Sequence, residues 1–222
     1  MATFTNRITE LIGNDYTTIA SNSYLDLFNA AVSEVADMAP PELLLKYAVD
    51  PSDLDENTTT LTTVEGKKVL LVTRLDDSSP RLAQECKPVS IQAFEKAKDA
   101  NSIYLATKYN PVYAYITDGG TTALTILPEP IVHEDVKVYH FTYTTISDLA
   151  VSTIAGLPNE LENAVVLKAC INILQTYISD FVQDEEDAEL QQMIMVQIKT
   201  LSVSFEKEMA RYMEQDATPR GE

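Results

Sequence analysis

One long stretch near the carboxyl end constrains the fold more than any other part of the chain. No glycine or proline interrupts the sequence between Pro158 and Pro219. Within this stretch apolar residues recur at steps of three and four, which places them on one face of a 3.6-residue helix. The predicted helical core residues are Leu167, Ile171, Leu174, Ile178, Phe181, Leu190, Ile194, Leu201 and Phe205. The stretch therefore predicts long amphipathic helices.

An acidic run divides this apolar pattern and suggests where the helix breaks. The acidic residues are Asp184, Glu185, Glu186, Asp187 and Glu189. One unbroken rod over residues 158–213 would reach ~84 Å, at about 1.5 Å per residue. Few domains of this size could cover such a rod, and an aspartate in the run could cap a second helix. We favour a helical hairpin, and a single long helix projecting from an assembly is the alternative.

The rest of the chain changes its hydrophobic period twice. Helical spacing covers residues 4–13, 22–39 and 41–47, with Gly13 and Pro40 as end signals. Residues 74–88 are polar and predict a loop, whereas residues 89–100 predict a helix capped by Ser90. Strand-like segments, with a Glu65-Gly66 turn and an Asp118-Gly119-Gly120 hairpin, are 60–63, 67–73, 103–106, 112–117, 122–127 and 136–143.

This order predicts an α+β fold, in which a helical bundle is formed by both chain ends and a β-rich insertion domain lies between its halves. The predicted helical adaptor domain comprises residues 1–57 and 146–214. The β-rich insertion domain comprises residues 58–145, and residues 215–222 are predicted to form a flexible tail.

The charge balance limits the partners that the chain can bind. Sixteen basic residues against 34 acidic ones give a net charge of −18. Such a surface repels nucleic-acid phosphates, because phosphate binding requires clustered Lys and Arg. A negative surface that only keeps the protein soluble is an equally good interpretation. No run of 18 apolar residues is present, so we expect no membrane span.

The residue types that carry chemistry are few, and we expect no catalytic, metal-binding or cofactor-binding site. His133 and His140 are seven residues apart, so on a strand they would face opposite sides. Cys86 and Cys170 are predicted to be free thiols. The acidic residues 184–189 could hold a hard cation, but a solvated helix start explains them better.

Aromatic residues are concentrated in the strand-rich part of the chain. A segment of this size is too small to bury all of them, and Tyr-rich surfaces often serve protein–protein contact. A self-contained sandwich core, with the hydroxyl groups reaching water, is the alternative. The candidate subunit-interface residues are Tyr104, Tyr109, Tyr113, Tyr115, Tyr139, Phe141 and Tyr143.

A set of short motifs spans most of the chain. They are the helical segment Leu25 to Pro40, Arg74-Leu75-Asp76-Asp77 followed by Cys86, Phe94-Glu95-Lys96-Ala97 leading into Ser102-Ile103-Tyr104, Asn110-Pro111-Val112-Tyr113, Leu127-Pro128-Glu129-Pro130, Val138-Tyr139-His140, and Leu157-Pro158-Asn159-Glu160 with Ala164 to Cys170. In these motifs the chain resembles the head–tail connector proteins of tailed bacteriophages, also called adaptor or neck proteins. The strand-rich insertion departs from compact members of that family.

The resemblance implies a structural role in the virion. Such proteins form homo-oligomeric rings, usually of twelve copies, beneath the portal protein, and they extend the channel through which DNA passes. It implies assembly in the host cytoplasm, a place in the phage neck next to the portal and to tail or neck proteins, and a part in tail assembly and genome ejection. Residues 184–187 and Glu189 become candidates for the channel wall, because an acidic wall does not retain DNA phosphates.

Two other functions remain possible at this stage. The chain could be a fibre- or baseplate-docking module that uses the strand-rich segment as its docking face. The weakest alternative is an enzyme that uses the acidic cluster with a metal ion.

Overall fold

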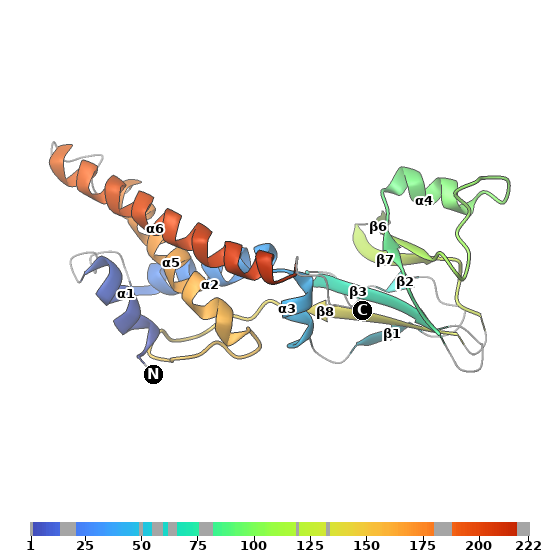
Figure 1. Cartoon of the computed structure of the whole chain (residues 1–222), viewed down its shortest axis with the longest axis horizontal. Helices are drawn as coiled ribbons and strands as arrows, with labels where there is room; N and C mark the ends of the chain where they lie inside the picture. The colour runs from blue at the N-terminus through green and yellow to red at the C-terminus, as the bar shows by residue number, and fades with distance from the viewer. Residues whose placement is uncertain are drawn as a thin grey trace. The chain divides into compact units, whose positions relative to one another are not determined.

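The structure, a computed structural model, describes residues 2–13, 21–48, 51–54, 60–61, 66–75, 82–118, 120–131, 134–179 and 188–216. The fold is mixed α+β, as the sequence predicts, with about 49% of these residues in helices and 23% in strands. The chain divides into two compact units (Figure 1). We name residues 1–47 with 143–222 the helical unit, and residues 48–142 the β-rich unit.

The boundaries of the two units differ from the predicted ones. Strand β1 (Ser52–Leu54) pairs antiparallel with β8 (Asp135–Phe141), so the chain joins the sheets soon after residue 47. The sequence pattern places these residues, up to 57, in the helical adaptor domain. The second boundary falls after residue 142 rather than 145. Helix α6 continues to Asp216, into the predicted tail, and the residues beyond it lie outside the described part.

Helix α1 (Phe4–Ile12) begins and ends at the residues that local signals select. The Thr3 hydroxyl accepts a 3.3 Å hydrogen bond from the backbone N–H of Asn6, which caps the first turn. Gly13 ends the helix with a φ of 85°, a conformation that glycine adopts without strain.

The amino end of α1 is tied to a segment far along the chain. The backbone N–H groups of Phe4 and Thr5 donate to the carbonyls of Val151 (3.0 Å) and Leu149 (3.1 Å). Phe4 is fully buried and its ring lies 4.8 Å from that of Phe28 on the next helix. Helix α1 is therefore held to residues 149–151, which belong to the same unit.

Helix α2 (Ser21–Met38) and the short α3 (Pro41–Leu45) follow, separated by Pro40 in an extended conformation. The face of α2 that carries Phe28, Ala31, Val32, Val35 and Ala36 is fully buried. This face packs on α5 (Glu162–Tyr177), and an ion pair between Glu34 and Lys168 (2.8 Å) joins the two helices at their edge. Buried apolar area of this kind supplies most of the stability of a helical unit.

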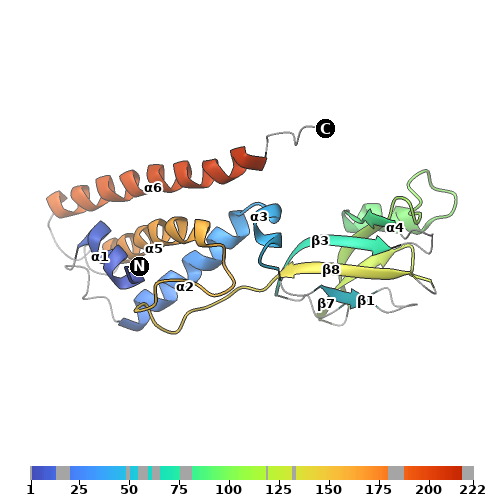
Figure 2. The ribbon, with the colours of Figure 1, turned by 60° about the horizontal axis from the view of Figure 1, so that its bottom comes forward.

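The uninterrupted stretch forms two helices that pack against each other, as the hairpin interpretation predicts. A 3₁₀ turn, η2 (Asn159–Leu161), leads into α5, and α6 (Ala188–Asp216) lies alongside it (Figures 1 and 2). The Tyr212 hydroxyl near the end of α6 donates to the carbonyl of Glu160, just before α5, so the two helices are antiparallel. None of the described helices combines the length and the apolar character that a membrane crossing requires.

The predicted helical core follows this packing. Five of its members are buried: Leu167, Ile171, Leu174, Ile194 and Leu201. Ile178, Leu190 and Phe205 are half-buried. Phe181 lies outside the described residues.

The β-rich unit contains two four-stranded sheets. One has the order β1-β8-β3-β4, with β3 (Lys68–Leu75) and β4 (Ala83–Glu85). The other has the order β2-β7-β6-β5, with β2 (Thr60–Leu61), β5 (Lys87–Pro88), β6 (Val112–Asp118) and β7 (Thr121–Leu127). Side chains from both sheets share one core, made of Val72, Cys86, Tyr113, Leu124, Ile126, Val136 and Val138. The two sheets therefore pack face to face.

Several local predictions for this unit are confirmed. Helix α4 (Ile91–Lys98) begins after Ser90, whose hydroxyl accepts a hydrogen bond from the backbone N–H of Ala93 (3.3 Å). Strands β6 and β7 form the predicted hairpin, in which Asp118 pairs with Thr121.

Three other predictions are wrong. Strands β2 and β3 do not form a hairpin around Gly66, because β2 pairs with β7 and β3 pairs with β8 and β4. The predicted loop over residues 74–88 contains the end of β3 and the strands β4 and β5. Residues 103–106 form a turn and an irregular segment rather than a strand, because the backbone N–H groups of Leu105 and Ala106 donate to the carbonyls of Ser102 and of Ala97 on α4.

Candidate functional site

Residues 99–110, which we name the apolar loop, follow α4 and are held by their own hydrogen bonds. The Asp99 carboxylate accepts from the backbone N–H of Asn101 (2.9 Å), and the Ser102 hydroxyl accepts from that of Tyr104 (3.1 Å). The backbone N–H of Ala106 donates a hydrogen bond to the carbonyl of Ala97 on α4 (3.0 Å). Side-chain to backbone bonds of this type fix turns, so the loop has a defined shape.

The apolar loop presents large apolar side chains to solvent. Ile103 is 92% exposed, Tyr104 is 63% exposed and Tyr109 is 68% exposed. Leu105 and, on the neighbouring helix α4, Ile91 are exposed as well. Single exposed apolar residues are ordinary, whereas a group of them on one short segment is typical of a contact surface.

A small core of its own supports the apolar loop. Helix α4 packs on the hairpin of β6 and β7. The buried residues of this contact are Phe94, Ala97, Ala106, Val112 and Ala114, with Val89, Ile116 and Leu127 partly buried around them. The loop that carries the exposed side chains is thus supported by the packed contact between α4 and the β6–β7 hairpin.

The charge of this part of the chain opposes that of the remainder. Residues 87–113 contain four lysines (Lys87, Lys96, Lys98 and Lys108) and two acidic residues (Glu95 and Asp99). Their net charge is therefore +2, within a chain of −18. The Nζ of Lys98 lies 5.2 Å from the Phe94 ring centre and pairs with Glu95, and that of Lys108 lies 5.3 Å from the Tyr109 ring centre.

The structure separates the predicted interface residues into three groups. Tyr104, Tyr109 and Tyr115 are exposed. Tyr139 and Tyr143 are half-buried, and the Tyr143 hydroxyl donates to the Asp37 carboxylate. Tyr113 and Phe141 are buried within this chain, so they present no surface to a partner. Tyr113 belongs to the core that the two sheets share.

A second apolar surface lies on α6. Ile194, Leu201 and Met209 are buried, and they form the side that packs in the helical unit. The exposed apolar residues of the helix are Met193, Met195, Val196, Val203 and Met213. Val196 and Val203 are seven residues apart, so they lie on the same side of the helix and opposite Ile194.

An open groove of about 640 Å³ lies beside this surface. Among the described residues it is lined by Glu189, Gln192, Met193, Val196 and Gln197. The Gln197 side-chain amide donates to the carbonyl of Leu11 (3.0 Å), which ties this part of α6 to α1. Of the predicted channel-wall residues, Glu189 is exposed at the groove. Asp184, Glu185, Glu186 and Asp187 lie outside the described residues.

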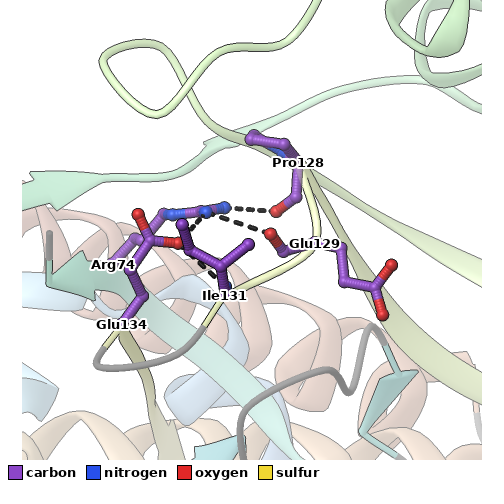
Figure 3. A network of polar contacts seen from close by, with 5 residues as sticks. All are labelled: Arg74, Pro128, Glu129, Ile131 and Glu134. Carbon is purple, nitrogen blue, oxygen red and sulfur yellow. Dashed lines mark hydrogen bonds and ion pairs between the residues drawn. The ribbon is translucent and has the colours of Figure 1, made fainter. Parts of the chain in front are cut away.

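A buried polar network shapes the β-rich unit (Figure 3). The Arg74 guanidinium donates to the carbonyls of Pro128 and Glu129 and pairs with the Glu134 carboxylate. Glu134 also accepts from the backbone N–H of Ile131 (3.0 Å). The sequence pattern places Arg74 in a loop; an arginine that ends an alternating apolar strand is the signal for this network. The network fastens Pro128, Glu129 and Glu134 to β3, and its buried ion pair is shielded from solvent.

The candidate chemical groups lie in structural positions. Cys86 and Cys170 are buried, and burial raises the pKa of each thiol to about 12. His140 is buried with its Nε2 3.1 Å from the Lys67 Nζ, and burial lowers the pKa of its imidazole. His133 lies outside the described residues. Within the described ranges, no three His, Cys, Asp or Glu side chains gather as a metal site requires.

Comparisons with known proteins identify no family for the chain. No protein-family model matches it, and no curated protein sequence matches it. The function is therefore inferred from the motifs and from the two apolar surfaces.

Proposed function

We propose that this protein is a virion structural protein, a head–tail connector subunit that forms a homo-oligomeric ring under the portal of a tailed phage. In this role the ring, expected to hold twelve copies, extends the DNA channel and contacts the portal on one side and tail or neck proteins on the other. The motifs described above, which resemble those of connector proteins, support this assignment. It gives the chain no catalytic step and no cofactor.

The fold is interpreted in the same way. We infer that the helical unit is the adaptor domain, a bundle formed by both chain ends, and that the β-rich unit is an insertion into it. The tie of α1 to residues 149–151 and the antiparallel packing of α5 and α6 support this interpretation. The core of the β-rich unit, shared by two sheets, is consistent with an insertion that folds as a unit.

The observation that carries the proposal is exposed apolar surface on both units of the same chain. The apolar loop belongs to the β-rich unit and the exposed side of α6 belongs to the helical unit. A ring with cyclic symmetry is built by a heterologous contact, in which two different patches of each subunit meet. A chain that carries two unlike patches fulfils this requirement.

The net charge is consistent with a channel that DNA traverses. A surface with a charge of −18 repels phosphate, so a bore lined by acidic side chains would not retain the genome. Glu189 and the acidic residues 184–187 are the proposed members of that lining. DNA would pass without specific binding.

Cryo-electron microscopy of the neck of purified particles tests the proposal. A ring of this chain between the portal and the tail is the expected result. Particles whose neck contains no density for the chain would contradict it.

A second function is favoured by the position of Ile103 and Tyr104 at an exposed loop of the β-rich unit. In this alternative the chain attaches a fibre or baseplate component, with the apolar loop as the docking face. Cross-linking in intact particles separates the two functions. Cross-links to portal subunits support the connector, and cross-links to fibre or baseplate subunits support the attachment protein.

A further inference from the structure

We propose that the apolar loop of one subunit docks on the exposed side of α6, at the groove beside Met193 and Val196, of a second copy of this chain. The inference rests on the proposed ring and goes further, because it names the two surfaces that meet between neighbouring subunits. It depends on three observations: apolar surface, shape and charge.

The apolar surfaces are the first observation. Most of the large exposed apolar side chains of the described residues fall into two groups, one on α4 and the apolar loop and the other on α6. Among the described residues, these side chains are exposed. Removing both from water in a single contact gains free energy in proportion to the apolar area buried.

The shapes of the two surfaces are the second observation. The apolar loop is convex at Ile103, which is almost fully exposed, and its backbone is fixed by hydrogen bonds. The groove on α6 has a volume of about 640 Å³ and apolar walls at Met193 and Val196. It offers room for the side chains of Ile103 and Tyr104. Methionine side chains adapt their shape to a partner, and a rigid aromatic side chain loses little entropy on docking.

Charge complementarity selects a second copy as the occupant. Residues 87–113 carry a net charge of +2, with Lys96, Lys98 and Lys108 close to the apolar loop in sequence. The helical unit contains seven basic and twenty acidic residues, which is a net charge of −13. Glu189 stands at the groove itself. The positive part of one subunit is therefore attracted to the helical unit of another, which steers the two copies together.

The pairing is heterologous, so each of the two surfaces can be changed alone. Two single variants therefore test it. Ile103→Asp disables the apolar loop, and Val196→Asp disables the groove side of α6. Both side chains are exposed, at 92% and 61%, so the thermal unfolding of each variant should match that of the wild type. Each variant alone should self-associate at least about tenfold more weakly than the wild type in sedimentation velocity.

A mixture of the two variants decides the geometry. Each keeps one intact surface, so the mixture should form a one-to-one heterodimer that does not grow further. If Ile103→Asp alone still forms a homodimer, α6 pairs with α6 and the proposal is overturned. If Val196→Asp alone forms a homodimer, loop pairs with loop and the proposal is equally overturned.

Cysteine cross-linking provides a second measurement for a weak contact. Tyr104→Cys chains mixed with Val196→Cys chains should be joined by a bis-maleimide, whereas Thr121→Cys with Val151→Cys, a pair of exposed control positions, should not. The native Cys86 and Cys170 are buried and should not react. A cross-linking yield no higher than that of the control pair would overturn the pairing.

Two further results separate this pairing from membrane binding and from the ring as a whole. Binding of the wild type, but not of Ile103→Asp, to phosphatidylserine vesicles without any chain-to-chain cross-link would assign the loop to a membrane and overturn the proposal. The neck reconstruction tests the ring independently. A ring without the loop-to-α6 contact refutes only this pairing, and the contact without a neck ring refutes only the proposed function.

Discussion

Arg74 and Glu134 form an ion pair in which both side chains are almost completely shielded from solvent, at 2% and 1% exposed. Arg74 comes from β3, and Glu134 directly precedes β8, the strand paired with β3. The remaining guanidinium contacts go to the carbonyls of Pro128 and Glu129, so the pair also fixes the chain between β7 and β8. A buried pair of this type stabilises the fold only while both partners are present.

Replacing one partner should therefore be costly. We expect Arg74→Met to lower the free energy of unfolding by about 3–5 kcal/mol, because it leaves the Glu134 carboxylate buried without its partner. Urea unfolding followed by circular dichroism measures the change. The double variant Arg74→Met with Glu134→Leu should be more stable than the single one, since no unpaired charge remains. Glu95→Gln removes an exposed ion pair with Lys98 and should cost less than about 0.5 kcal/mol. Equal losses for Arg74→Met and Glu95→Gln would contradict the prediction.

Leu174 tests the packing of the helical unit. It is fully buried on α5, where α2 and α6 both pack. We expect Leu174→Ala to lower the free energy of unfolding by about 2–5 kcal/mol, through lost apolar burial and the cavity left behind. Ile178→Ala is the matched control: Ile178 is half-buried beyond the end of the same helix, so its loss should be smaller. A loss below about 1 kcal/mol at Leu174 would show that its face is not covered in solution.

His140 should make stability depend on pH. Burial, with the nearby charge of Lys67 as a second cause, lowers the pKa of its imidazole below the usual 6.5. The unfolded chain then binds the proton more readily than the folded one, so stability rises with pH across this window. The contribution of His140 is complete above pH 6.5 and is lost as the pH falls through its folded pKa.

His140→Gln removes this contribution. The difference in unfolding free energy between wild type and variant should therefore shrink between about pH 7 and pH 5, as followed by thermal or urea unfolding in matched buffers. Lys67→Gln should move the imidazole pKa back toward 6.5, which NMR titration of the ring protons measures. Parallel pH profiles for wild type and His140→Gln would refute the assignment.

The two cysteines should be inert in the folded protein. Burial raises the pKa of Cys86 and of Cys170 to about 12, so at pH 8 only about one thiol in ten thousand is ionised. We expect no labelling by iodoacetamide under native conditions and labelling of both residues in urea, read by mass spectrometry. Val151→Cys, at an exposed position of the helical unit, is the control that should react promptly. Rapid native labelling of Cys86 would indicate that the two sheets separate readily.

In the proposed connector ring, the acidic residues 184–187 should matter for DNA passage more than for folding. Changing residues 184–187 to serine removes four negative charges and no apolar side chain. We expect the thermal unfolding temperature to be nearly unchanged, while genome ejection from particles that carry the variant slows, because the channel loses part of its repulsion. A variant that does not fold would show that these residues are structural.

The helices could be predicted from the sequence because their signals are local. The spacing of Leu167, Ile171 and Leu174 identifies a buried helical face, and Thr3 with Gly13 marks the two ends of α1. The Asp118-Gly119-Gly120 turn identifies the hairpin of β6 and β7 for the same reason. Such features depend on neighbours within a few residues.

The strand pairings and the exposed surfaces could not be read in the same way. Strands β2 and β3 are adjacent in sequence, yet they pair in different sheets because their partners lie far along the chain. The sequence around Arg74 is typical of a loop. The ion pair with Glu134, sixty residues later, forms only in the folded chain. Residues 103–106 have the composition of a strand. Only the hydrogen-bonded turn at Ser102 and Tyr104 leaves Ile103 exposed to solvent. Each of these outcomes depends on tertiary contacts that local patterns do not contain.

The tie between the backbone of Phe4 and that of Val151 has a consequence for synthesis on the ribosome. The first helices emerge long before α5, the helix against which α1 and α2 bury their apolar faces. Residues 48–142 complete their own core in the meantime, so nascent chains should fold from the middle outward. The amino-terminal helices should lack their packing partner α5, and Phe4 and Phe28 should stay accessible to solvent, until residue 177 has been synthesised. A truncated chain that ends between residues 142 and 160 should therefore hold a finished β-rich unit and a protease-sensitive amino terminus.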